Sequence, residues 1–170
     1  LLYMSKYSLR DYQAFDMLQL MSKMSYSDNG GLILSEQRTG KTRVALSTML
    51  ETTSVASNVL IVCPPAAVSG WRDECKFYAE KWMLKTTVIR KAKDIKDLHL
   101  IWHPSYRNIR IITYNLFKML TIPQIRLLCG TANSKDLTFI GDEVHRLRNF
   151  KTMQSDAIFS FKDLCEKDKV

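Results

Sequence analysis

The chain has 170 residues, 46% of them hydrophobic and 25% charged, so it can form one globular domain with an ordinary apolar core. Its formal net charge of +8 favours a polyanionic partner such as nucleic acid, although a basic surface kept for solubility would give the same value. No run is long and apolar enough to span a bilayer and the first residues lack the order of a signal peptide, so we expect a soluble intracellular protein, in cytoplasm or nucleus, without a membrane partner.

Five short apolar runs, nearly continuous rather than alternating in hydrophobicity, predict β-strands that are covered on both faces. In chain order they are residues 32–35, 59–63, 86–89, 109–113 and 137–140. Helical spacing is found in the stripe Tyr12, Phe15, Leu18 and Met21 and over 42–50, 69–78, 94–102 and 116–128, the last with a break at Pro123. The alternation predicts an α/β fold with a parallel sheet and helices on both faces.

A phosphate-binding loop is predicted at residues 35–42, S-E-Q-R-T-G-K-T, which follow the first predicted strand and open a helix. Backbone N–H groups at a helix N-terminus face a bound anion, and Gly40 lets the backbone approach it. Lys41 can reach the β- and γ-phosphates, and the Thr42 hydroxyl can ligate magnesium. An ordinary strand–helix junction is the alternative, because Gly-Lys-Thr also arises by chance and Ser35 replaces the usual first glycine.

Two adjacent carboxylates, Asp142 and Glu143, end the last predicted strand. An aspartate at a strand end can hold magnesium or its water ligands, and the next residue can act as the base for the attacking water. Solvated caps of a strand end are the alternative, which the Gly-Lys-Thr loop in the right order disfavours. The sequence therefore predicts a site for ATP and Mg²⁺ in which Lys41 and Glu143 are catalytic and Thr42 and Asp142 hold the metal.

Five ordered blocks resemble segments of the Swi/Snf-type superfamily 2 ATPases. Residues 142–149, D-E-V-H-R-L-R-N, are similar to D-E-A-H-R-[LI]-[KR]-N, and residues 36–42 are similar to E-M-G-L-G-K-T. Residues 9–13 resemble L-R-P-Y-Q, and residues 112–114 resemble the family's I-T-T-Y or V-I-T-Y segment. The fifth block, L-I-V-x-P…W-x-x-E, matches residues 60–65 with Trp71 and Glu74.

This resemblance implies that residues 1–170 are the first RecA-like domain, with P-loop NTPase fold, of a motor whose second RecA-like domain lies elsewhere. It implies an adenine contact for Gln13 and a coupling role for His145. The remaining nucleotide contacts that it implies are Arg10, Glu36, Gln37, Arg38, Thr39, Gly40, Lys41 and Thr42. Arg38 departs from the family, which has a glycine there.

The resemblance also implies that the loops after the second and fourth predicted strands contact one strand of double-stranded DNA. Those loops are residues 65–70 and 113–116, and the implied donors are Ser69, Thr113, Asn115, Arg148 and Asn149. Contacts to phosphates position a protein without reading sequence, so we expect sequence-independent binding. The alternatives are that Trp71 is a helix-packing aromatic and that Tyr114 caps the core. For the basic residues 90–93 a solvated strand end is the favoured interpretation.

Family members carry one more strand after the D-E-x-H segment, between the phosphate-loop strand and the D-E-x-H strand. We therefore expect a sheet that is incomplete at the C-terminus and a chain that is nearly inactive alone. The leading hypothesis is an ATP-driven translocase on duplex DNA. The alternatives are a truncated nucleotide-binding regulatory module, or the motor part of a restriction subunit or strand-separating helicase.

Overall fold

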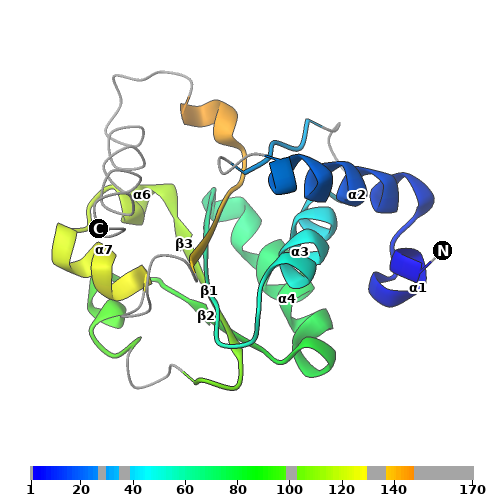
Figure 1. Ribbon diagram of the computed structural model, residues 1–170. Helices are drawn as coiled ribbons and strands as arrows, with labels where there is room; N and C mark the ends of the chain where they lie inside the picture. Colours follow the sequence, from blue (N-terminus) through cyan, green and yellow to red (C-terminus); the bar gives the residue numbers. More distant parts are fainter. Residues whose placement is uncertain (1, 27–29, 35–38, 99–102, 130–136, 148–170) are drawn as a thin grey trace. The chain divides into compact units, whose positions relative to one another are not determined.

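The computed structural model describes residues 2–26, 30–34, 39–98, 103–129 and 137–147 (Figure 1). The chain divides into two compact units, Leu1–Thr53 and Ser54–Val170. Within the described ranges no helix has both the length and the apolar character needed to cross a membrane.

The second unit contains a four-stranded, all-parallel sheet with strand order β2-β3-β1-β4. Its strands are β1 (Asn58–Cys63), β2 (Leu84–Val88), β3 (Arg107–Thr113) and β4 (Leu137–Gly141). The predicted α/β fold is therefore confirmed, and it is consistent with a RecA-like domain. In the register of the sheet Cys63 lies beside Thr113 and Val62 beside Gly141, so β1, β3 and β4 end at one edge.

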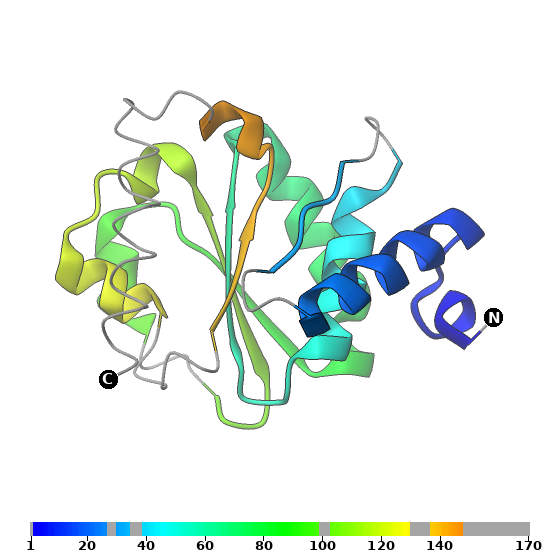
Figure 2. The same ribbon diagram turned by 45° about the horizontal axis from the view of Figure 1, so that its top comes forward.

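Helices cover both faces of this sheet, as predicted. Figure 2 shows the strands close to edge-on, with α4 (Val68–Trp82) on one side and α6 (Tyr114–Phe117) and α7 (Ile122–Cys129) on the other. The α6 and α7 side forms an apolar core that includes Leu60, Val62, Ile112, Ile125 and Leu128. All six residues of β1 are buried, which is why this run is continuously apolar rather than alternating.

A charged side chain lies inside the same face of the sheet. Arg110, in the middle of β3, is only 4% exposed, and its guanidinium donates a hydrogen bond to the carbonyl oxygen of Leu128. Burial lowers the pKa of this guanidinium. A cation at a helix C-terminus satisfies a carbonyl that the helix leaves open, so Arg110 fixes the end of α7 against β3.

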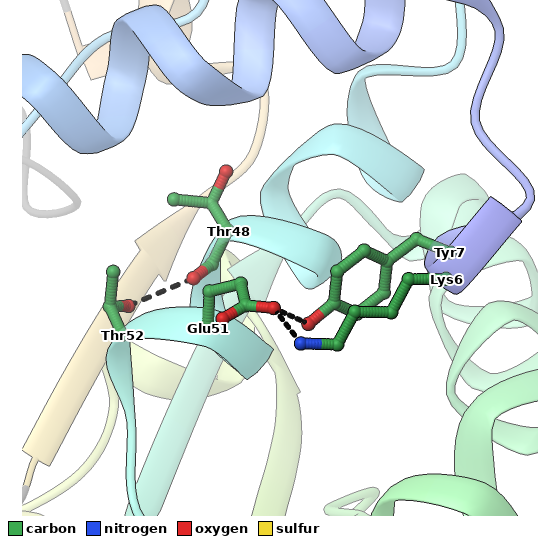
Figure 3. Close-up of polar contacts among 5 residues, drawn as sticks. All are labelled: Lys6, Tyr7, Thr48, Glu51 and Thr52. Atoms are coloured by element: carbon green, nitrogen blue, oxygen red, sulfur yellow. Dashed lines mark hydrogen bonds and ion pairs between the residues drawn. The ribbon is translucent and has the colours of Figure 1, made fainter. Parts of the chain in front are cut away.

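The first unit consists of α1 (Leu2–Tyr7), α2 (Asp11–Tyr26) and α3 (Lys41–Thr52). Figure 3 shows how α1 is held to α3: the Glu51 carboxylate accepts hydrogen bonds from Lys6 Nζ and the Tyr7 hydroxyl. At the next residue of α3, the Thr52 hydroxyl donates to the Thr48 carbonyl one turn earlier at 2.9 Å. The contacts of Glu51 therefore fix α1 to the last turn of α3, the helix that begins in the predicted phosphate-binding loop.

The predicted helix over the first apolar stripe is present as α2, but the stripe is not its buried face. Phe15 is 61% exposed and Leu18 46%, whereas Ala14 and Met17 are buried. The spacing of apolar residues identified the helix correctly, but it did not identify the side of the helix that packs.

The predicted strand over 32–35 is not present in the described residues. Residues 32–34 have no strand pairing, and Leu32 and Leu34 are 59% and 87% exposed. Ser35 lies outside the described residues.

Two predicted helices also differ from the structure. At the start of the helix predicted over 94–102 the chain forms a short 3₁₀ turn, η2 (Ala92–Ile95), and Leu98 is α-helical. The Asp94 carboxylate accepts the N–H groups of Arg90 at 3.0 Å and Lys91 at 2.9 Å. Residues 99–102 lie outside the described ranges. The break in the 116–128 region falls before Pro123, which lies in the first turn of α7, where a proline costs no hydrogen bond.

Candidate functional site

The described part of the predicted phosphate loop is the start of α3. Gly40 caps this helix with a left-handed backbone, φ 83° and ψ 32°, and α3 begins at Lys41. The Gly40 carbonyl accepts the N–H groups of Arg43 at 2.9 Å and Val44 at 3.2 Å. The helix is twelve residues long, so its first turn has the dipole and the N–H groups of an anion site. Three of the predicted contacts, Glu36, Gln37 and Arg38, lie outside the described residues.

Gln13 holds the loop from α2. Its side-chain oxygen accepts the Arg10 N–H at 3.0 Å, and its amide nitrogen donates to the Thr39 carbonyl at 2.9 Å. The Tyr12 hydroxyl donates to the same carbonyl at 3.3 Å. Gln13, the residue predicted to contact adenine, is 6% exposed, so in this structure it is a buried side chain that holds the loop backbone by a hydrogen bond. Its contact with adenine stays a prediction, as does that of the exposed Arg10 side chain.

Asp142 follows β4 and is held at three of its atoms. Its N–H donates to the Val62 carbonyl at 2.9 Å, and its own carbonyl accepts the Tyr114 hydroxyl at 2.8 Å. Its carboxylate oxygen Oδ2 accepts the Trp71 indole N–H at 2.8 Å. No described residue donates to Oδ1, so one carboxylate oxygen is fixed and the other is open to a ligand.

This arrangement fits a magnesium ligand. No group of three His, Cys, Asp or Glu side chains in the described ranges could enclose a metal ion by itself. Magnesium does not need such a cage, because it keeps several waters and is held by one or two carboxylates together with substrate phosphates. A half-buried aspartate with one anchored and one open oxygen supplies that kind of ligand.

Glu143 has an unusual backbone for a glutamate, with φ 56° in the left-handed region. Such a conformation is uncommon for a residue with a Cβ and recurs at active sites; Ser8, Ala56 and Met83 share it in this chain. Its Oε2 lies 3.1 Å from Nδ1 of His145, and both side chains are partly exposed. The turn directs the Glu143 carboxylate to solvent and next to an imidazole, where a water-activating base could work. His145, the predicted coupling residue, therefore contacts the predicted base.

The Cys63 thiol lies at the end of β1 beside this turn. Burial, and secondly the charge of Asp142, raise the pKa of the Cys63 thiol to about 12. The thiol is therefore neutral at ordinary pH, and it adds no second negative charge beside the predicted metal ligand.

Trp71 and Tyr114 are the residues whose part in the site sequence reasoning missed. They are 2% and 3% exposed, so the interpretation as packing aromatics is correct. Each also turns its polar group to Asp142. The pattern W-x-x-E and the residue after I-T were visible in the sequence, but neither spacing shows which atom an indole N–H or a phenol would reach.

The predicted DNA-contacting residues that are described lie after β1 and β3. Ser69 is exposed in the first turn of α4, and Asn115 is exposed in α6. Thr113 is half-buried, and its hydroxyl oxygen caps α6 by accepting the Leu116 N–H at 3.3 Å. Because β1 and β3 end side by side, these residues share one edge of the sheet. Arg148 and Asn149 lie outside the described residues.

One comparison with known proteins covers almost the whole chain. The family model described as "Type III restriction enzyme, res subunit" matches residues 6–166, which include every predicted site residue. No curated protein matches the chain.

Proposed function

Since the chain belongs to the family of type III restriction enzyme res subunits, and is thus a helicase-like, ATP-binding superfamily 2 domain, we propose that it hydrolyses ATP with Mg²⁺ to move on double-stranded DNA. The main structural support for the proposal is the Asp142 carboxylate. Its Oδ2 accepts a hydrogen bond from Trp71, while its Oδ1 accepts none from the described residues and can bind magnesium. The finer assignment is a translocase of the Swi/Snf type, supported by the five sequence blocks from residue 9 to residue 149.

Each predicted site residue has a distinct task in this proposal. Lys41 would contact the β- and γ-phosphates, and the Thr42 hydroxyl and Asp142 carboxylate would be the ligands of the metal. Glu143 accepts the proton of the attacking water, and His145 next to it links this base to the rest of the motor. Bound Mg²⁺ would supply charge neutralisation on the phosphates. Gln13 keeps the loop backbone in place through Thr39.

Double-stranded DNA is the nucleic acid that we propose the motor binds and moves along. The proposed contacts come from Ser69, Thr113, Asn115, Arg148 and Asn149. The net charge of +8 supports a polyanion. Hydroxyl and amide donors at one sheet edge suit phosphate oxygens, which carry no base sequence. A second RecA-like domain of the same motor is the proposed protein partner, because arginines across the cleft raise the rate by about 10³ or more in such ATPases.

The motor part of a restriction subunit is the second candidate, and the description of the matching family favours it. Such a motor would use the same ATP chemistry as the translocase, and the two candidates differ only in the purpose of the movement along DNA. A truncated regulatory module would bind nucleotide without turnover.

The proposal is tested by ATP turnover with and without duplex DNA, followed by displacement of a third strand from a DNA triplex. A translocase is stimulated by duplex and displaces the third strand while the two duplex strands stay paired. Separation of the duplex itself would favour a helicase. Nucleotide binding without turnover, in the presence of duplex, would leave the regulatory module.

A further inference from the structure

We infer that Trp71 and Tyr114 are positioning residues that hold Asp142 in the geometry of a metal ligand and join it to both predicted DNA-contacting loops. The inference rests on the proposed function, because it concerns how the metal ligand of that site is held. All the contacts that carry it lie within the second unit of the chain.

The first contact fixes the carboxylate. The Trp71 Nε1–H donates to Asp142 Oδ2 at 2.8 Å across 71 positions of sequence. An indole can only donate, so this bond keeps Oδ2 as an acceptor and holds the carboxylate plane. Hydrogen bonds to an ionised acceptor are the strong ones, and Trp71 is 2% exposed, which excludes competing water. The carboxylate then presents Oδ1 in one orientation.

The second contact fixes the backbone of the same residue. The Tyr114 hydroxyl donates to the Asp142 carbonyl at 2.8 Å, and the Asp142 N–H is paired with Val62 of β1 at 2.9 Å. Gly141, the preceding residue, leaves room mainly for the Val144 side chain. A Cβ there would lie 3.4 Å from the Tyr114 hydroxyl and 2.9 Å from Val144 Cγ1. Main chain and side chain of Asp142 are thus held by two separate aromatic donors.

The two donor residues, Trp71 and Tyr114, lie next to residues that are predicted to contact DNA. Trp71 stands two positions after Ser69 in the first turn of α4, and Tyr114 stands between Thr113 and Asn115. Tyr114 therefore belongs to one of the segments predicted to contact phosphates, and Trp71 directly follows the other. A displacement of either segment acts on Asp142 through one hydrogen bond. Packing alone would not require a polar atom from each segment to converge on the same residue.

The Trp71 bond can be tested without any enzyme activity. The chain has three tryptophans, so a ¹⁵N spectrum contains three indole N–H signals, which Trp71→Phe and Trp82→Phe assign. Asp142→Asn weakens the acceptor by removing its charge. We expect this variant to shift the Trp71 signal and to speed its exchange with solvent, while the Trp82 signal stays in place. An unmoved Trp71 signal would overturn the inference.

The positioning role is tested by the affinity for ADP, measured by titration calorimetry with and without magnesium chloride. In Trp71→Phe we expect the gain in affinity due to magnesium to fall about tenfold, with the magnesium-free affinity unchanged, because partners of metal ligands typically contribute this much. Trp82→Phe, the same change at the other end of α4, is the control and should retain the full gain. Tyr114→Phe removes only the hydroxyl, keeps the ring in the core, and should also lose part of the gain.

The outcomes separate this inference from the proposed function. Equal losses with and without magnesium in Trp71→Phe, or a full gain in both aromatic variants, would overturn the positioning role alone. A wild-type chain whose ADP affinity gains nothing from magnesium would instead contradict the proposed function, and the inference with it. If Trp71→Phe does not fold, the Tyr114→Phe result decides between the same outcomes.

Discussion

The side-chain amide of Gln13 occupies the place where a Cβ of residue 40 would stand. An added Cβ on Gly40 would lie 2.2 Å from the Gln13 amide nitrogen, which donates to the carbonyl of Thr39 at 2.9 Å. Residue 40 must therefore lack a side chain for two separate reasons, the left-handed φ of 83° and the close approach of Gln13. The Gln13 side chain of α2 therefore fits against the start of α3 only when residue 40 is a glycine.

Gly40→Ala should consequently damage the loop beyond the cost of backbone strain. We expect ATP affinity to fall about tenfold or more, since strain and displacement of Gln13 each cost about 1–2 kcal/mol. Gly30→Ala is the matched control, because Gly30 has a similar φ of 79° but no atom within 4 Å of an added Cβ. It should lower the melting temperature slightly and leave ATP affinity unchanged. Similar affinities in the two variants would show that the Gln13 contact does not shape the loop.

Lys41→Ala should weaken magnesium–ATP binding by about tenfold or more, because it removes a charged contact to the β- and γ-phosphates. Titration calorimetry measures this directly. Lys23→Ala, an exposed lysine in the last turn of α2, controls for the loss of one positive charge from the chain. If Lys41→Ala and Lys23→Ala bind ATP equally well, the nucleotide-site assignment is wrong.

Glu143→Gln should bind ATP normally and lose about 100-fold or more in hydrolysis, because the amide keeps the shape and loses the basicity. Single-turnover assays with duplex DNA and the complete motor isolate this step. His145→Ala, which removes the 3.1 Å partner of Glu143, should reduce hydrolysis less, since the base itself remains. Undiminished turnover in Glu143→Gln would mean that another residue activates the water.

The sheet was predictable from sequence because buried strands have runs of apolar residues that are visible without the structure. β1 is buried along its whole length, so its run is almost continuously apolar and marks both the strand and its two covered faces. β3 is buried to a similar extent, and Arg110 interrupts its apolar run. The run at 32–34 has the same signal and forms no strand in the described structure. A local pattern predicts which residues favour a strand, but pairing depends on a neighbour that the pattern does not contain.

The position of two carboxylates at a strand end was also predictable, because Asp142 and Glu143 directly follow an apolar run. What surrounds them was not. The Trp71–Asp142 bond joins residues 71 positions apart, and the Gln13–Thr39 bond joins two others 26 positions apart. Only the fold brings such donors and acceptors together. Similarly, the left-handed backbone of Glu143 has no sequence signature, since glutamate gives no preference for it.

Binding of duplex DNA should be independent of sequence and sensitive to salt, because the proposed contacts are to phosphates. We expect affinity to fall steeply as salt rises from about 50 to 200 mM, as counterion release requires. Ser69→Glu and Asn115→Glu place a negative charge at the two exposed positions that follow β1 and β3, and both should weaken binding without changing ATP affinity. Fluorescence anisotropy with two unrelated duplexes of equal length gives the affinity and the sequence dependence together.

The control for this prediction comes from the opposite edge of the sheet. Ser105 is exposed just before β3 begins at Arg107, so Ser105→Glu makes the same chemical change at the amino ends of the strands. Repulsion acting through net charge would weaken binding equally in all three variants, whereas a phosphate-contacting edge makes Ser69→Glu and Asn115→Glu worse than Ser105→Glu. The difference should shrink at high salt, since charges separated by more than about 8 Å are screened there. Equal binding by the three variants at low salt, or a strong preference for one duplex sequence, would place the DNA elsewhere on the molecule.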